Sequence, residues 1–456
     1  MKQGRADSVG DDEQPMVTTV AVVGAGMSGL IAARELSRQG IDVLVLESAD
    51  RPGGRMMTET SPLGSRLDLG GQWVGHGHHR FTALADELGT KLFPMRTPKQ
   101  PAFIEGSRKI PALSPTMLMA NLALVAWELR SKTAAPERWA SKTVEDWLSK
   151  VPGHKARRLL EVLVSVSTTA DLNRFTMHAF AEAIRYQGGL MTMLGTDGGA
   201  QEGLIVEGAG TLSERLASDL GPRVLTEHRV TSIHHDDSGV TLHTTSSTVR
   251  AAKVIVTVPP PMSARIVYEP PLPASRTALE QNTYMGSVYK AIAVYERPFW
   301  REHKGHAEFM ILDRPGGAAF DTSPPGGPGH LCVLVAGPEA REFDHLGTAG
   351  RRQAILGPLA THLDRKILDP VSWHEKSWHL DEHAGGGYTA LPDPGATDGY
   401  FPMPSQPVGN IHWGGTETAS EHAGYIEGAI ESGERVAREV IEGLPRTTAQ
   451  RESDTT

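Results

Sequence analysis

A glycine-rich turn between two apolar runs near the start of the chain constrains its fold most. Residues 18–23 are mostly apolar and lead into Gly24-x-Gly26-x-x-Gly29, a helical stretch follows, and a second apolar run ends at Glu47. This is the βαβ pattern of a dinucleotide site: glycines permit the tight turn and close approach of a pyrophosphate, the helix N-terminus faces the phosphates, and the acid binds a ribose. Isolated glycine turns are common, but every part of the unit is present, so we predict a Rossmann-type α/β domain.

The residues after Glu47 add a second glycine-rich turn that carries an arginine. Gly54 and Arg55 follow the acid closely, and Gly70-Gly71 comes next, before Gln72 and Trp73. A dinucleotide that stays bound through turnover needs a permanent counter-charge and close backbone approach to its ring system. This stretch closely resembles the flavin-containing amine oxidase family. The alternative for Arg55 is an ordinary surface arginine in a turn.

The C-terminal part carries the second set of matching residues. The run from His412 to Glu417 precedes a loop and a helix predicted to continue to Ile441, with its apolar residues on one face. In the family this helix directs its positive N-terminal end at the flavin ring and so stabilises negative charge there. An acid like Glu417 contacts the flavin side chain or its phosphates. The resemblance covers about residues 17–441.

The resemblance implies a bound FAD. We expect the residues that bind it to come from both ends of the chain and from two positions between them: Gly24, Gly26, Met27, Ser28, Gly29, Glu47, Ser48, Gly54, Arg55, Gly70, Gly71, Gln72, Trp73, Val230, Trp378, Gly415, Glu417, Gly424, Tyr425 and Ile426. Monoamine oxidases have a cysteine, linked covalently to the flavin, where this chain has Gly387. Because glycine has no thiol, we expect the FAD to be held without a covalent bond.

Lys290 is the expected catalytic lysine. It lies in an apolar run of residues 286–295, where strand alternation places Val288, Ile292 and Val294 on its face. Neither face is polar, so the lysine would be buried, which is costly without a purpose. The family has its lysine in this context, bonded through a water to flavin N5. A snorkelling lysine on an edge strand is the alternative.

Two tyrosines match the aromatic residues that enclose the amine in the family. Tyr388 follows Gly387, and Tyr425 precedes the last helix. Two facing rings would admit an amine and hold its α-carbon against the flavin. Either tyrosine alone would more often be a packing residue. We therefore predict Lys290, Tyr388 and Tyr425 as the catalytic residues.

Composition restricts the partners. The formal charge is 45 − 54 = −9, which disfavours nucleic acid and anionic membranes as partners. One cysteine, Cys332, excludes an intramolecular disulfide. With no long apolar run and no signal peptide, we expect a cytoplasmic protein that works without a membrane. His76, His78 and His79 form a turn without carboxylate partners, more typical of solvated surface than of a metal site, so we expect no metal. The family resemblance allows a homodimer.

The fold class is expected to be mixed α/β, with the FAD-binding domain interleaved with a substrate domain of sheet and helices. Helical periodicity spans residues 115–129, 143–150 and 154–168, and short apolar β runs return from residue 223. We expect disordered ends at 1–15 and 445–456. The FAD-binding domain is assigned to 16–96, 201–270 and 391–444, and the substrate domain to 97–200 and 271–390.

Three functions agree with these residues. The first is oxidation of a primary amine, a monoamine or small diamine, by hydride transfer to flavin N5, giving an aldehyde or ketone, ammonia and hydrogen peroxide, with dioxygen as the second substrate. The second is an L-amino acid oxidase of the same fold, which needs an arginine such as Arg174 or Arg185 to bind a carboxylate. The third is a flavin-binding scaffold without turnover.

Overall fold

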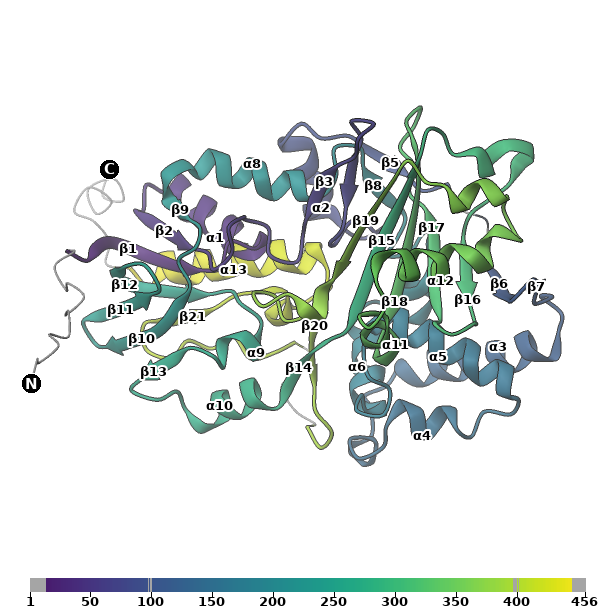
Figure 1. Cartoon of the computed structure of the whole chain (residues 1–456). Coiled ribbons are helices and arrows are strands. Elements are labelled where there is room, and N and C mark those ends of the chain that lie inside the picture. The colour runs from purple at the N-terminus through teal and green to yellow at the C-terminus, as the bar shows by residue number, and fades with distance from the viewer. Residues whose placement is uncertain (1–13, 97, 99–100, 397–399, 401, 445–456) are drawn as a thin grey trace, which may run out of the picture.

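Two sheets lie side by side, and the chain passes from one to the other and back (Figure 1). The computed structural model of the chain describes residues 14–96, 98, 101–396, 400 and 402–444. The ends expected to be disordered lie outside these residues, apart from Gln14 and Pro15, which precede the first strand.

The first sheet contains the predicted βαβ unit. Helix α1 (Met27–Arg38) connects β1 (Met16–Val23) to its parallel neighbour β2 (Val43–Leu46). The strand order is β13-β10-β11-β12-β1-β2-β9, and β21 pairs in parallel with the end of β12. The remaining strands are β9 (Val224–Leu225), β10 (Val230–Asp236), β11 (Gly239–Thr244), β12 (Thr248–Val256), β13 (Val267–Glu269) and β21 (Ile411–Trp413).

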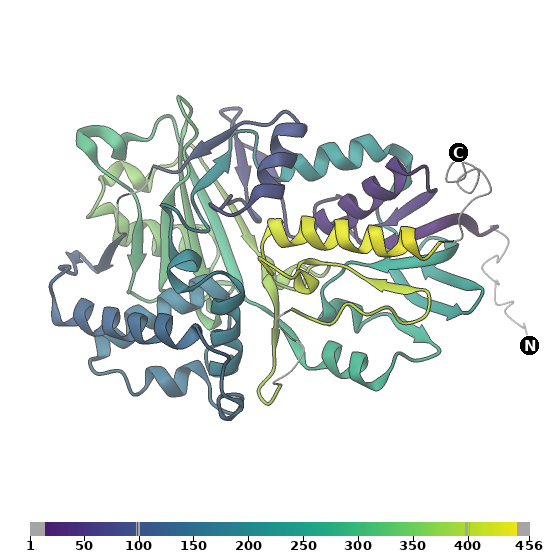
Figure 2. The same ribbon diagram turned by 180° about the vertical axis from the view of Figure 1, so that it is seen from behind.

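Both faces of the central parallel strands are buried, which explains their continuous apolar runs. Val20 and Val22 of β1 face helices α1, α8 (Gly210–Leu220) and α13 (Ile426–Glu442). Ala21 and Val23 face the opposite way, into a cluster with side chains of β10–β12 and β21. Figure 2 shows α13 lying across the first sheet, so the last helix of the chain covers its first strand.

The second sheet has the order β19-β15-β18-β17-β16-β6-β7 and is antiparallel except at β16 and β6. On β15, Tyr289 and Ala291 pack with α11 (Pro338–Phe343) and α12 (Thr348–Ala360), whereas Val288 and Lys290 face the other way. The strands are β6 (Ala102–Glu105), β7 (Arg108–Lys109), β15 (Val288–Tyr295), β16 (Phe309–Ile311), β17 (Gly317–Asp321), β18 (Gly329–Ala336) and β19 (Ser372–Ser377).

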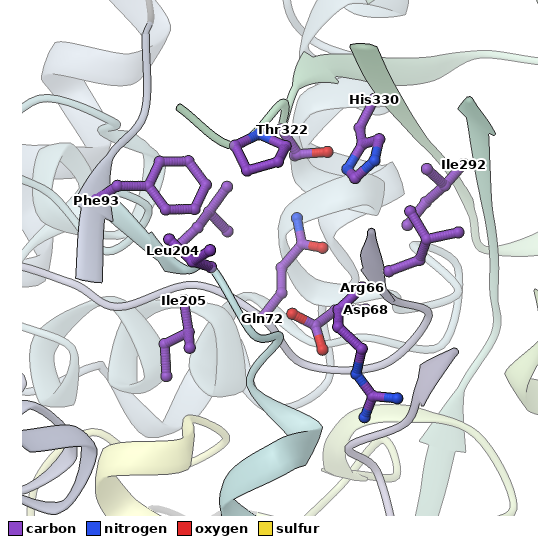
Figure 3. Close-up of a pocket in the computed structure, with 12 residues that line it drawn as sticks. Arg66, Asp68, Gln72, Phe93, Leu204, Ile205, Ile292, Thr322 and His330 are labelled. Atoms are coloured by element: carbon purple, nitrogen blue, oxygen red, sulfur yellow. The ribbon is translucent and has the colours of Figure 1, made fainter. Parts of the chain in front are cut away.

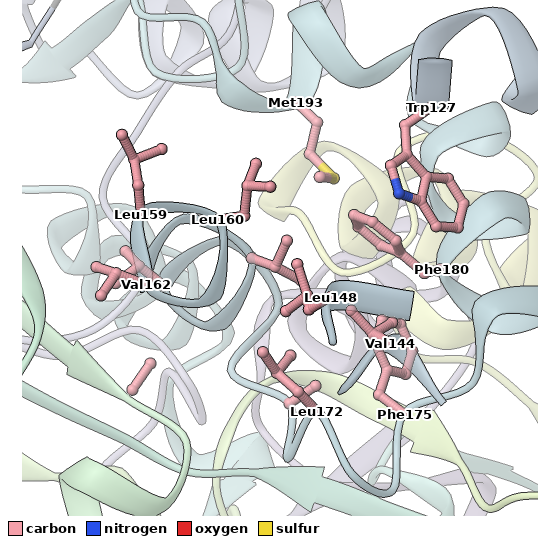
Figure 4. Close-up of a cluster of buried hydrophobic side chains, with 14 of the residues drawn as sticks. Trp127, Val144, Leu148, Leu159, Leu160, Val162, Leu172, Phe175, Phe180 and Met193 are labelled. Carbon is pink, nitrogen blue, oxygen red and sulfur yellow. The ribbon is translucent and has the colours of Figure 1, made fainter. Parts of the chain in front are cut away.

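A helical cluster covers the Val288 end of this sheet (Figure 4). Trp127 lies at its centre and makes edge contacts with Trp147 and Phe180. The predicted helices in this part of the chain are confirmed. The elements are α3 (Pro115–Ser131), α4 (Val144–Leu148), α5 (His154–Thr168), α6 (Met177–Tyr186) and α7 (Leu190–Leu194).

Short hairpins and helices lie between and beside the two sheets. The chain visits the first sheet, then the second, and returns to each, so the predicted interleaving is observed, while the exact domain boundaries stay a prediction. The connecting pairs are β3 (Thr58–Thr60) with β4 (Arg66–Asp68), β5 (Leu92–Pro94) with β8 (Gly203–Ile205), and β14 (Thr283–Gly286) with β20 (Gly387–Pro392). The remaining helices are α2 (His79–Glu87), α9 (Pro260–Ser263) and α10 (Ala274–Gln281).

Replacing Gly433 by alanine tests the packing of α13 on α1. A Cβ atom there would lie 2.5 Å from the Ser28 carbonyl oxygen and 3.0 Å from Ile31 Cβ. Gly433→Ala is therefore expected to lower the free energy of unfolding by about 1–3 kcal/mol in chemical denaturation. Gly350→Ala, on the exposed surface of α12, is the control and should not lower stability. Equal stability of the two variants would contradict this account of the packing.

Candidate functional site

The first glycine turn forms a cradle at the N-terminus of α1. Gly24 has a φ of +100°, and a Cβ at Gly29 would lie 2.0 Å from the Gly24 carbonyl oxygen, so both positions require glycine. A Cβ at Gly26 would have nothing within 4 Å, so this backbone borders open space. No side chain caps α1, whose first N–H groups, at Met27 and Ser28, are therefore available to an anion. The cradle fits a pyrophosphate.

Glu47 closes the cradle at the end of β2. Its carboxylate accepts hydrogen bonds from the N–H groups of Ala25 (2.7 Å) and Ala49 (2.8 Å). The Ser48 hydroxyl lies 3.2 Å from the same carboxylate. The Glu47 carbonyl accepts the N–H of His228, which brings the start of β10, with Val230, beside the predicted ribose acid.

The second glycine turn lies directly against the first. Gly53 N–H donates to the Ala25 carbonyl at 2.8 Å, and a Cβ at Gly54 would lie 3.3 Å from Gly26 Cα. Gly70 is equally enclosed, because its Cβ would lie 2.3 Å from the Arg55 carbonyl oxygen. The structure thus brings the predicted glycines of residues 24–71 together around one space.

Arg55 links this turn to two distant parts of the chain. Its guanidinium donates to both carboxylate oxygens of Glu417, at 2.6 and 3.1 Å, and to the Tyr388 carbonyl at 2.7 Å. Burial alone would raise the pKa of the Glu417 carboxyl, but the charge and hydrogen bonds of Arg55 hold it below its usual range. Arg55 is therefore a structural bridge and not a free surface arginine.

The C-terminal motif meets the first helix. Ser28 Oγ accepts the N–H of Gly415 at 3.0 Å and lies 2.9 Å from Ser432 Oγ on α13. Gly415 and Gly424 both have left-handed φ values, +96° and +88°. Ile426 begins α13 beside Gly71, whose Cβ would lie 3.6 Å from Ile426 Cδ1. No side chain caps α13, so its positive end is open toward the glycine turns.

Lys290 is buried, as predicted, with 3% of its surface exposed. Its Nζ donates to the Gly70 carbonyl at 2.8 Å and to Gln72 Oε1 at 2.6 Å, and it lies 5.4 Å from the centre of the Trp73 ring. Burial lowers the pKa of this amine, although Cys332 and Asp68 act in the opposite direction. Burial therefore disfavours the protonated form of Lys290, and the two neutral acceptors can receive two of its N–H groups in either protonation state.

Gln72 also forms part of the wall of a small polar cleft (Figure 3). The cleft is bordered by Arg66 and Asp68 from β4 and by His330 from β18. The Gln72 amide therefore lies between the lysine and a cleft on the β4 side of the second sheet.

The two predicted tyrosines come together next to this lysine. Gly387, which precedes Tyr388, would place a Cβ 3.0 Å from Val288 Cγ1 on the strand of Lys290. A Cβ at Gly424, which precedes Tyr425, would likewise lie 3.3 Å from Thr389 Cβ. Burial is the main cause that raises the pKa of both hydroxyls, and for Tyr388 the proximity of Cys332 and Tyr425 adds to it. Both side chains stay neutral phenols at ordinary pH.

Several residues around the site were not found from sequence. Phe320 of β17 makes an edge contact with Trp73, with ring centres 5.4 Å apart, and Gln187 Oε1 accepts the Tyr425 hydroxyl at 3.4 Å. Trp378, by contrast, was predicted from sequence, and its Nε1 donates to the Leu69 carbonyl at 2.7 Å, next to Gly70. Strand alternation in residues 317–321 could have indicated the orientation of Phe320; no local pattern marks Gln187.

The histidine turn differs from expectation in two respects: His76 Nδ1 lies 3.3 Å from a carboxylate oxygen of Glu202, and one of the three histidines is buried. His76 and His79 are exposed, but His78 is buried, because the neighbouring Gly75 leaves room for its ring. In the described part of the chain, no group of three or more histidine, cysteine, aspartate or glutamate side chains could hold a metal ion. Within the same residues, no helix has the length and apolar character needed to span a membrane.

Comparison with known proteins decides the family. A family model described as flavin containing amine oxidoreductase matches residues 27–441. The chain belongs to this family. The protein is therefore an FAD-dependent oxidoreductase that acts on amines.

Known relatives of this flavin amine oxidase cover nearly its whole length. A putative flavin-containing monoamine oxidase AofH of Mycobacterium tuberculosis is 35% identical over 93% of this chain and 97% of its own. An L-amino acid dehydrogenase of Synechocystis is 32% identical, covering 92% and 94%. Cyclohexylamine oxidase from Brevibacterium oxydans has the same fold, with a TM-score of 0.89, 29% identity, and 94% and 100% coverage. These matches confirm the predicted mixed α/β fold.

Glu417→Gln tests the ion pair of this flavin amine oxidase. Because the folded pKa of Glu417 is lowered, the pair contributes its stability above the unfolded pKa, and that contribution is lost as the pH falls through the folded value. At pH 7 the variant should lose about 3 kcal/mol of unfolding free energy, since Arg55 keeps its charge without a partner. The difference from the parent protein should shrink in acid. Urea denaturation at several pH values measures it, and a difference independent of pH would contradict the assignment.

Proposed function

We propose that the protein catalyses the oxidative deamination of a primary amine with dioxygen. The amine, dioxygen and water would give an aldehyde or ketone, ammonia and hydrogen peroxide. The observation that carries the proposal is the buried Lys290 amine, which within the described residues bonds to the neutral Gly70 carbonyl and Gln72 amide oxygens and faces the Trp73 ring. A scaffold without turnover would have no use for a buried lysine that costs stability.

FAD bound in the cradle supplies the redox chemistry: it accepts two electrons and the α-hydrogen of the amine and passes electrons on to dioxygen. The first-turn N–H groups of α1 would hold its pyrophosphate, and Glu47 a ribose. The uncapped N-terminus of α13 would face the end of the ring where negative charge develops on reduction. These residues bind and orient the cofactor.

The chain selects the neutral form of the amine. An ammonium ion cannot be oxidised in this way, because its nitrogen has no lone pair to stabilise the developing iminium. Tyr388 and Tyr425 keep their protons, so the rings carry no anionic charge to hold an ammonium. Because burial lowers the pKa of Lys290, its amine can give up a proton more readily than an exposed lysine and then accept a hydrogen bond or a proton from the substrate amine or from a water. Trp73 and Phe320 add an apolar surface for the carbon substituent.

The FAD is proposed to be held without a covalent bond. Gly387 stands where a covalent link would need a thiol, and its neighbour Thr169 donates a hydrogen bond to the Gly387 carbonyl, so only backbone is presented there. Cys332 is buried, and its sulfur lies 3.9 Å from the Gln72 amide nitrogen. Acid denaturation should therefore release all the FAD.

The second candidate is oxidation of an L-amino acid, favoured by the relative with that substrate in its name. It requires a free arginine near the tyrosines. Of the two arginines considered from sequence, Arg174 is paired with Asp393 and stacks on the Tyr284 ring, and Arg185 is paired with Glu182. Both arginines are already paired with carboxylates of the protein, so neither is free to bind a substrate carboxylate. Oxidation of a primary amine is therefore the better supported function.

Anaerobic reduction of the flavin distinguishes the candidates. The purified protein is mixed without oxygen with benzylamine, cyclohexylamine, putrescine, L-leucine or L-phenylalanine, and the flavin absorbance is followed. We expect bleaching by at least one amine and by neither amino acid. Bleaching by amino acids alone would establish the second candidate, and no bleaching by a broader panel of amines and amino acids would leave only the scaffold.

Lys290→Met tests the role of the lysine. Methionine fills a similar volume without the amine, so the variant should fold and bind FAD, while flavin reduction or its reoxidation by dioxygen should slow about 100-fold. Stopped-flow absorbance measures both half-reactions. Lys155→Met is the control, because Lys155 is exposed and forms only a surface ion pair with Glu105. Rates for Lys290→Met equal to those of the control would remove the lysine from the mechanism.

A further inference from the structure

The buried His78 imidazole and the half-buried His422 imidazole meet the Tyr425 ring from distant parts of the chain. His78 precedes α2, and its ring centre lies 5.2 Å from that of Tyr425 at an angle of 61°. His422 precedes α13 and lies 4.9 Å from His78 and 6.3 Å from Tyr425. All three contacts are edge-to-face, the arrangement that aromatic pairs prefer. The cluster surrounds one of the two tyrosines proposed to enclose the amine.

Two glycines make the space for these imidazoles. A Cβ at Gly75 would lie 2.9 Å from His78 Nε2, so any larger residue would displace the ring. A Cβ at Gly77 would lie 3.4 Å from His422 Cε1, a tight contact. The glycines at residues 75 and 77 are therefore explained by the packing of the pair.

A hydrogen bond fixes which ring nitrogen of His78 is protonated. The Gly75 N–H donates to His78 Nδ1 at 2.9 Å, so that nitrogen carries no proton and the neutral ring is protonated at Nε2. Burial, followed by the nearby His422 and His79, lowers the pKa of His78 to about 3. The ring is uncharged throughout the working range of pH.

His422 is also held neutral. Burial lowers its pKa, assisted by Arg80 and His79, while Glu427 and Glu421 oppose the shift. The Glu427 carboxylate is itself engaged, since it accepts the N–H groups of Phe81 at 2.8 Å and Arg80 at 3.1 Å at the start of α2. Two neutral rings therefore support Tyr425 without placing a cation beside the amine.

Tyr425 is held at both ends by these contacts. Its hydroxyl donates to Gln187 Oε1, and its ring rests on the imidazole edges. We propose that His78 and His422 are positioning residues that set the plane of the Tyr425 ring and thereby the fit of the substrate amine. The proposal rests on the proposed amine oxidation, but the ring contact itself can be tested without turnover.

Two substitutions separate the ring contact from the hydrogen bond. His78→Asn keeps an acceptor for the Gly75 N–H and removes the ring edge, whereas His78→Phe keeps the ring and removes the acceptor. His79→Asn is the control, because His79 is the exposed neighbour on the same turn. Each variant is purified with bound FAD and assayed with the panel amine that reduces the flavin fastest.

We expect His78→Asn to raise KM about fivefold to tenfold, as loss of an aromatic contact would, with kcat changed less than threefold. His78→Phe should keep KM within about twofold of the parent, as should His79→Asn. An unchanged KM in His78→Asn, or an equal rise in His78→Phe, would overturn the proposal.

A second measurement does not depend on catalysis. Tetranitromethane nitrates accessible tyrosine rings, and mass spectrometry of Tyr425 peptides reports its protection in the FAD-bound protein. Nitration of Tyr425 should increase in His78→Asn and stay low in His78→Phe. Equal protection in all variants would overturn the positioning role, whether or not any amine is oxidised, whereas failure of every amine to bleach the parent flavin would contradict only the proposed function.

Discussion

The site depends on one ion pair that joins three remote segments. Arg55 comes from the second glycine turn, Glu417 from the C-terminal motif, and the Tyr388 carbonyl from the strand that follows Gly387. Taking two charges out of water is costly, and the bidentate geometry with its additional carbonyl acceptor is what offsets that cost. With this pair in place, the cofactor cradle, the open end of α13 and the proposed amine enclosure share one rigid frame. A substitution at any of the three partners is therefore expected to alter the positions of the other two.

Local sequence patterns predicted those elements whose residue types and spacing are enough to indicate their structure. The βαβ unit was predictable because glycines, apolar runs and the acid at residue 47 each fill a separate role within a short stretch. The burial of Lys290 followed from an alternating strand without a polar face, and the structure confirms it at 3% exposure. Family resemblance supplied the roles of Tyr388 and Tyr425; their mutual proximity is visible only in the fold.

Contacts between remote residues could not be predicted in this way. Arg55 and Glu417 are 362 positions apart, and nothing near either one indicates its partner. His78 looked like part of a solvated turn because its burial depends on space left by Gly75 and on His422 from the other end of the chain. Gln187 reaches Tyr425 through the packing of helices on the second sheet, and no periodicity of its own sequence reveals this, whereas strand alternation indicates only the direction of Phe320 and not its contact with Trp73.

The order in which the chain crosses between its two sheets has a consequence for biosynthesis. Strand β1 emerges from the ribosome first, but β21 and α13, which complete its sheet and cover it, emerge last. Until these elements are made, the nascent chain therefore exposes the apolar face of an incomplete sheet. Loading of the prosthetic group therefore requires that β21 and α13 have been made, so the yellow holoprotein marks only those molecules that contain both elements.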